Sequence, residues 1–206
     1  RHHNEFIYNS LMKKFLAIFI LSLYFMTPSQ ANDIRDFQIE GISIGDSLLD
    51  YFNEDIIKEN KENIYDWVEK NKNKFSVSEI MDNKKFLSYD VMQFVYKTDD
   101  PKYTIYALSG MIDYRNNIKD CYTEKDIIEK VLKNLFIGLS KTGLINKKHT
   151  ADSSGKSYVS LSDYKFPNDS HRIVIECTDW SKKMKHHDNL RIQIKTKEFD
   201  EWLFNR

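Results

Sequence analysis

LSYDVMQFVYKTDDPKYTIYALSGMIDY, residues 87–114, contains two runs that are rich in aromatic and β-branched residues and are separated by an Asp/Pro turn. This pattern predicts a β-hairpin with strands at Leu87–Lys97 and Tyr103–Tyr114. The second run has apolar residues on both faces, with Ile105, Ala107 and Met111 on one and Tyr106, Leu108 and Ile112 on the other. A strand with two apolar faces is covered from both sides, so we expect it to lie in the middle of a sheet.

The remaining chain predicts three more strands and one long helix. The strands are expected at Ser157–Phe166, Arg172–Thr178 and Leu190–Thr196, and a polar loop at Lys147–Lys156. Thr123-Glu124-Lys125-Asp126 has the spacing of a capping box, and Gly143 fits a helix C-cap. Between them the apolar residues Ile127, Val131, Leu135 and Leu139 recur every four positions. This spacing predicts an amphipathic helix that packs on the sheet.

The two ends of the folded region carry shorter elements. Asp36–Ile44 is interpreted as a short strand ended by Gly45, Ser47–Asp50 as a capping box, and Glu54–Lys70 as a surface helix. Thr196 is expected to cap a final helical turn whose Phe199, Trp202 and Leu203 dock on the core. The order of elements predicts an α+β fold: an antiparallel sheet of about five strands, one long amphipathic helix packed on it, and short N-terminal helices.

The N-terminal region has the pattern of an export signal. Met12-Lys13-Lys14 is a positive segment, Phe15–Met26 is an apolar run too short to span a bilayer, and Ser29 and Ala31 suit a signal-peptidase site. We therefore interpret residues 12–31 as a signal peptide and residues 1–11 as an upstream non-native extension. Residues 32–206 are then one exported domain, periplasmic or secreted, with no stable membrane span after cleavage.

Charge and composition exclude several classes of protein. The chain carries 31 Lys+Arg and 31 Asp+Glu, and loss of Arg1, Glu5, Lys13 and Lys14 with the leader would leave a net charge of −2. This balance lacks the positive charge expected of a nucleic-acid binder, so we predict no nucleic-acid partner. The 14% aromatic content argues against a disordered chain.

Cys121 and Cys177 are the two cysteines of the chain. In an exported protein an even pair predicts a disulfide, and the alternative is two buried free thiols. Cys177 shares the apolar face of its strand with Ile173 and Ile175, while Cys121 precedes the predicted long helix. The bridge would join the start of that helix to the sheet, with the two Cα atoms about 4.4–6.8 Å apart.

Gly45-Asp46-Ser47-Leu48 resembles the first block of the GDSL-type esterases and lipases, and the resemblance implies a nucleophilic Ser47. Such a serine needs a base, an acid that orients the base, and oxyanion donors. The family takes them from Asp-x-x-His and Gly-x-Asn-Asp motifs, and this chain contains neither. The alternative interpretation is that Asp46 or Ser47 caps a helix.

Three further short motifs have the residue types of binding sites. His186-His187-Asp188 follows Lys182-Lys183-Met184-Lys185, a basic loop for which a metal or phosphate ligand competes with simple solvation. His149 and His171 are isolated. Gly155-Lys156-Ser157 matches the end of a phosphate-binding loop, but Thr150 replaces its first glycine. We interpret all of them as solvated loops and expect no metal and no cofactor.

The segment Asp33–Phe52, together with Asp120-Cys121-Tyr122, Gly155-Lys156-Ser157 and Thr196–Leu203, resembles a group of small exported proteins of marine bacteria. The resemblance implies export and a shared fold, and no activity. We therefore expect a non-enzymatic module that binds a protein or another component of the cell envelope. The alternative is an esterase that uses Ser47.

Overall fold

The computed structural model describes residues 34–62, 74–81, 84–115, 117–136, 138–166 and 171–204. The predicted signal peptide at 12–31 and the extension at 1–11 lie outside these residues. Within them, no helix is both long enough and apolar enough to cross a membrane.

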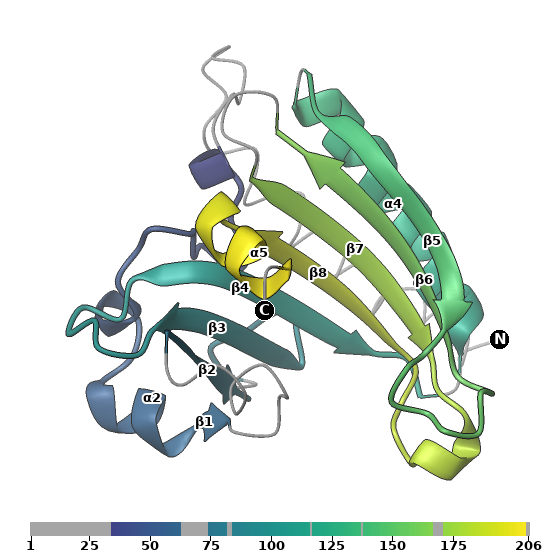
Figure 1. The fold of residues 1–206 in the computed structure, drawn as a ribbon, viewed down its shortest axis with the longest axis horizontal. Coiled ribbons are helices and arrows are strands. Elements are labelled where there is room, and N and C mark those ends of the chain that lie inside the picture. Colours follow the sequence, from purple (N-terminus) through teal and green to yellow (C-terminus); the bar gives the residue numbers. More distant parts are fainter. Residues whose placement is uncertain are drawn as a thin grey trace, which may run out of the picture.

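A single antiparallel sheet of eight strands dominates the described residues, in the order β1-β2-β3-β4-β8-β7-β6-β5 (Figure 1). The strands are β1 Lys61–Glu62, β2 Phe75–Ile80, β3 Val91–Lys97, β4 Ile105–Asp113, β5 Ser140–Lys148, β6 Tyr158–Lys165, β7 Arg172–Asp179 and β8 Asn189–Lys195. The hairpin of β3 and β4 is confirmed, and β4 lies at the centre, paired with β3 and β8. The predicted strands at β6, β7 and β8 are confirmed as well.

The expected α+β fold with about five strands and one long helix is wrong. The sheet has eight strands, and the described residues add three short helices, α2 Glu54–Glu59, α4 Ile118–Leu135 and α5 Lys197–Phe204. Helix α4 begins before the supposed capping box, and the Thr123 hydroxyl donates to the Lys119 carbonyl inside the helix. It ends at Leu135, and Gly143 lies in β5 instead of capping a helix.

The structure also differs from the expectations for residues 36–44 and 54–70. Residues 36–44 form no strand, because the chain turns back on itself through an isolated bridge between Ile39 and Ile42. The expected helix at 54–70 ends at Glu59 and is followed by β1, while residues 63–70 lie outside the described part.

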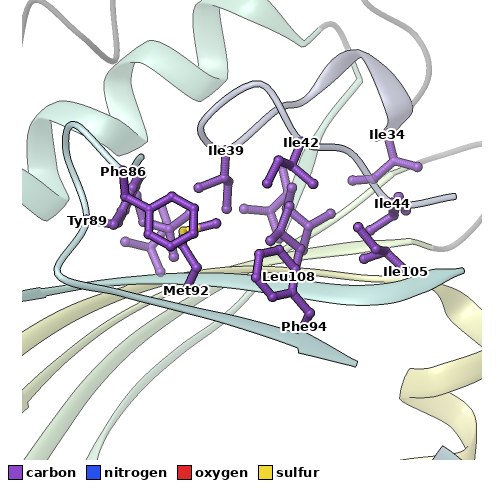
Figure 2. Close-up of a cluster of buried hydrophobic side chains, with 14 of the residues drawn as sticks. Ile34, Ile39, Ile42, Ile44, Phe86, Tyr89, Met92, Phe94, Ile105 and Leu108 are labelled. Atoms are coloured by element: carbon purple, nitrogen blue, oxygen red, sulfur yellow. The ribbon is translucent and has the colours of Figure 1, made fainter. Parts of the chain in front are cut away.

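One face of the sheet carries the main hydrophobic core (Figure 2). The N-terminal segment contributes a row of fully buried side chains, Ile34, Ile39, Ile42, Ile44 and Leu48. They belong to one cluster with Met92 and Phe94 of β3 and Leu108 of β4. Helix α4 covers the same face over β7 and β8. This core explains why a short irregular segment keeps a fixed position although it adds no strand.

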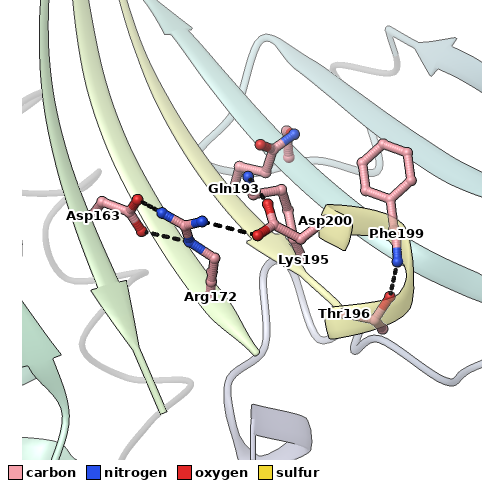
Figure 3. Close-up of polar contacts among 8 residues, drawn as sticks. Asp163, Arg172, Gln193, Lys195, Thr196, Phe199 and Asp200 are labelled. Carbon is pink, nitrogen blue, oxygen red and sulfur yellow. Dashed lines mark hydrogen bonds and ion pairs between the residues drawn. The ribbon is translucent and has the colours of Figure 1, made fainter. Parts of the chain in front are cut away.

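Helix α5 covers part of the opposite face, as its apolar residues predict. Phe199 packs against Phe75 with ring centroids 5.2 Å apart, and Thr196 caps the helix by accepting from the Phe199 amide at 3.2 Å. Charged side chains also attach it to the sheet (Figure 3). Asp200 accepts from Arg172 at 2.9 Å and from Lys195 at 2.5 Å. The second ion pair of Arg172 is with Asp163 on β6.

The predicted disulfide is confirmed. Cys121 and Cys177 are bonded, with their Cα atoms 6.0 Å apart. Both residues are fully buried, Cys121 in the first turns of α4 and Cys177 on β7. The bridge therefore joins α4 directly to β7, an interior strand of the sheet.

Replacing Gly110 by alanine is expected to lower the free energy of unfolding by about 1–3 kcal/mol, because a Cβ there would overlap the ring of buried Tyr89. Gly143→Ala is the matched control in another strand, since its Cβ would meet nothing closer than 3.7 Å. Urea unfolding of both variants measures the difference. Equal stability of the two variants would show that the Tyr89 ring moves aside at little cost.

Candidate interaction site

Strand β5 is the long exposed edge of the sheet. It pairs with β6 over eight residue pairs, and no strand among the described residues pairs with its other side. Every residue of β5 is exposed except Gly143, which is half-buried. The opposite edge is the two-residue strand β1. Edge strands present unpaired N–H and C=O groups that can pair with another chain, so β5 is the edge suited to binding.

Two large apolar side chains lie on this edge. Leu144 is 60% exposed and Ile145 is 40% exposed. Because side chains alternate along a strand, Leu144 points to one face of the sheet and Ile145 to the other. Leu144 lies opposite Ser162, whose hydroxyl bonds to α4, and therefore points to the α4 face. An added strand would contact an apolar residue on each face.

A carboxylate whose side chain is 12% exposed holds the start of β5 in place. Glu129 of α4 accepts hydrogen bonds from Lys141 of β5 at 2.8 Å and from Tyr164 of β6 at 2.8 Å. It also accepts from Ser162 and Lys125. Burial opposes the charge, but these four donors outweigh it and lower the pKa of Glu129 to about 2. The exposed hairpin is thus fixed to the helix at its open end.

The loop between β5 and β6 is organised around Asp152. This buried carboxylate accepts from the Ser154 amide, from the Ser157 amide and hydroxyl, and from the Ser181 hydroxyl. Hydrogen bonds from Ser154, Ser157 and Ser181 keep the pKa of Asp152 well below its usual range. Since Ser181 follows β7, Asp152 ties the β5–β6 loop to the loop between β7 and β8.

An aromatic contact joins the same two loops. The ring of Trp180 lies 4.2 Å from that of His149 and 4.9 Å from that of His186. Burial lowers the pKa of His149, which favours the neutral ring. His187 instead contacts Asp113 at 3.2 Å. In the described part of the chain no three His, Cys, Asp or Glu side chains are placed to hold a metal ion.

The two loops concentrate positive charge at one end of the sheet. We define the basic loop cluster as the six lysines Lys147, Lys148, Lys156, Lys182, Lys183 and Lys185. All six are exposed, and none forms an ion pair with the described residues. The local carboxylates Asp152 and Asp188 are buried and accept hydrogen bonds from the loops themselves. The exposed Asp113, which contacts His187, and the half-buried Asp179 also lie at this end, and the six lysines outnumber these carboxylates.

The Ser47 hydroxyl forms hydrogen bonds with main-chain groups. Its hydroxyl donates to the Lys102 carbonyl at 2.6 Å and accepts from the Leu49 amide at 3.2 Å, which caps the short helix η2 Leu48–Asp50. Asp46 accepts from the Ser43 amide and the Tyr51 hydroxyl. Neither partner of the Ser47 hydroxyl is a base that could take its proton, so the geometry is that of a capping residue.

No family model, curated protein or solved structure matches the chain. The fold and the site define it as a disulfide-bonded antiparallel-sheet protein with an exposed edge strand beside a basic loop cluster.

Strand β5 is not predicted from the sequence, which instead indicates a helix end and a polar loop over these residues. The sequence of β5 gives little signal, because it is polar and lysine-rich and its pairing with β6 shifts register between Lys141 and Gly143. The basic motifs are recognisable in the sequence, but as three separate solvated loops and not as one cluster.

Proposed function

We propose that this protein is an exported, non-enzymatic binding module that takes an extended segment of a partner protein as an additional strand on β5. The observation that carries the proposal is the exposure of β5 along nearly its whole length with an unpaired edge. Strand addition of this kind obtains affinity from main-chain hydrogen bonds and specificity from neighbouring side chains. Leu144 and Ile145 supply those side chains.

Export and the absence of catalysis are supported by separate observations. A buried disulfide fits an oxidising compartment, in agreement with the leader pattern of residues 12–31. The Ser47 hydroxyl is bonded to main-chain groups, which favours a binding role over the esterase alternative.

A second copy of this chain is a poorer partner than a different protein. Two β5 strands paired antiparallel about Leu144 would place Lys141 opposite Lys147, and like charges directly opposite each other are destabilising. Binding to an unlike strand avoids this repulsion. Analytical ultracentrifugation of the protein alone should therefore show a monomer.

Selection of a phage-displayed random peptide library on the wild-type protein should enrich peptides with alternating β-branched or aromatic residues. We expect Ile145→Lys to bind these peptides at least about tenfold more weakly, because it replaces one of the two apolar side chains that an added strand would contact with a charge. Its stability should change by no more than about 0.5 kcal/mol, since the position is exposed. Fluorescence anisotropy measures the binding.

Ile127→Lys is the matched control, because Ile127 is an isoleucine of similar exposure, 36%, that lies on α4 and not on β5. It should bind the selected peptides as the wild type does. Equal binding by the Ile145→Lys and Ile127→Lys variants, or no enrichment at all, would contradict the proposal.

A further inference from the structure

We infer that the basic loop cluster binds acidic residues at the N-terminal end of the partner segment that adds to β5. This inference rests on the proposed function and specifies the chemistry of the partner. The segment would carry Asp or Glu residues directly before its alternating β-branched or aromatic residues.

The basic loop cluster lies at the C-terminal end of β5. Lys147 and Lys148 are the last two residues of β5, so the edge strand runs directly into the cluster. The loops that follow β5 and β7 leave the sheet at the same end, and Ser181 bonds to both Asp152 and Ser157 across them. We therefore expect an added strand that extends past Lys148 to approach these two joined loops and their lysines.

The positive charges of the six lysines are available to a ligand. A lysine that is already paired with a carboxylate of the fold attracts an anionic ligand only weakly. The six lysines of the cluster have no carboxylate partner among the described residues. Lys141, at the other end of β5, is already paired with Glu129. The edge is thus polarised, with its free positive charge at the C-terminal end, and complementary charge sets the orientation of a partner.

The direction of the sheet fixes which end of the partner is acidic. Every strand pairing in the described sheet is antiparallel. An antiparallel strand added to β5 places its own N-terminal end beside Lys147 and Lys148. Acidic residues are therefore expected before, and not after, the paired residues.

A protein segment fits the site better than an anionic lipid surface does. The free lysines adjoin a row of unpaired main-chain groups and the exposed Leu144 and Ile145, which a lipid headgroup would leave unused. The following experiment distinguishes binding of a peptide from binding of lipid.

The experiment measures the affinity of three synthetic peptides for the full protein by fluorescence anisotropy. They are Glu-Asp-Glu-Thr-Val-Thr-Ile-Thr-Val, the same apolar segment with the acidic tail at the C-terminal end, and the first peptide with Gln-Asn-Gln as its tail. The first should bind at least about tenfold more tightly than the other two at about 0.05 M salt. The advantage should shrink at about 0.5 M salt because ions screen exposed charges.

Lys182→Glu/Lys183→Glu/Lys185→Glu removes positive charge from the cluster and leaves β5 intact. This variant should lose the tenfold advantage of the first peptide. Lys119→Glu/Lys130→Glu/Lys133→Glu on α4 changes the net charge equally, and it should retain the advantage. Both triple variants alter exposed residues, and circular dichroism checks their folding.

The two proposals fail in different ways. Equal affinity of the first peptide for both triple variants, or tighter binding of the reversed peptide, overturns the acidic-end inference, while sensitivity to Ile145→Lys would still support strand addition. Peptide binding that Ile145→Lys does not weaken overturns strand addition itself. If no peptide binds and vesicles of anionic phospholipid bind to the wild type but not to the cluster variant, the loops bind lipid and the inference is wrong.

Discussion

Replacing both Cys121 and Cys177 by alanine is expected to lower the free energy of unfolding by about 4 kcal/mol. The bridge closes a loop with a sequence separation of 56 residues, and the chain-entropy relation for a loop of this length gives about 4 kcal/mol at 25 °C. Removal of the bridge would also leave α4 held by packing, by the contacts of Glu129 and by the hydrogen bond that the Tyr114 hydroxyl donates to Glu124. Urea unfolding of the double variant beside the oxidised wild type measures the loss.

The reduced wild-type protein is the matched control for this experiment, because it has the same side chains without the covalent link. Its midpoint in urea should lie close to that of the double alanine variant. A loss below about 1 kcal/mol in both would contradict the role given to the bridge.

Glu129→Gln is expected to lower the free energy of unfolding by about 3 kcal/mol at pH 7. The variant leaves Lys125 and Lys141 without their carboxylate partner, and Lys125 is almost fully buried. Breaking a buried ion pair by removing one partner is costly because the remaining charge stays desolvated. The loss should fall mainly on the β5–β6 hairpin, which Glu129 ties to α4.

The pH dependence of the Glu129 contribution has a defined direction. Its pKa in the folded protein is about 2, below the ordinary value of 4.5, so its stabilisation is present above pH 4.5. It is lost as the pH falls from 4.5 towards 2, and the wild type and Glu129→Gln should become equally stable near the lower limit.

Glu198→Gln is the control for Glu129→Gln, because Glu198 also bridges two lysines, Lys74 and Lys97, but is 42% exposed. Exposed ion pairs contribute about 0–1 kcal/mol, so this variant should lose much less. Equal losses in the two variants would contradict the special role of Glu129.

The strands that could be predicted are those whose side-chain pattern matches their burial. β3 and β4 are aromatic and β-branched and lie in the middle of the sheet, and β8 alternates as its half-covered position requires. Helix α5 was predicted for the same reason, since Phe199 and Trp202 had to be buried somewhere.

The elements that could not be predicted are those whose burial is set by distant residues. β5 has a polar, lysine-rich sequence and keeps its place through Glu129 of α4, which no local pattern reveals. β1 lies inside a segment with a helical pattern and pairs with β2 over two residues only. The capping-box spacing predicts a start of α4 that is too late in the sequence. The disulfide and the core hold the helix from its true start at Ile118.

The candidate site was visible only as separate motifs. Lys147-Lys148-His149, Gly155-Lys156-Ser157 and the loop at 182–187 each resemble an ordinary solvated turn. They meet because successive antiparallel strands place alternate turns at the same end of the sheet. Without β5 in the predicted topology, that convergence could not be derived.

Amide hydrogen exchange along β5, with and without the most enriched peptide, is the most direct test of strand addition. In the free protein, alternate amides of β5 point away from β6 and should exchange rapidly because they have no strand partner. Saturation with the peptide should protect these outward amides, and leave those of β2 and β3 at the other end of the sheet unchanged. Tight peptide binding without protection of the outward β5 amides would contradict strand addition at this edge.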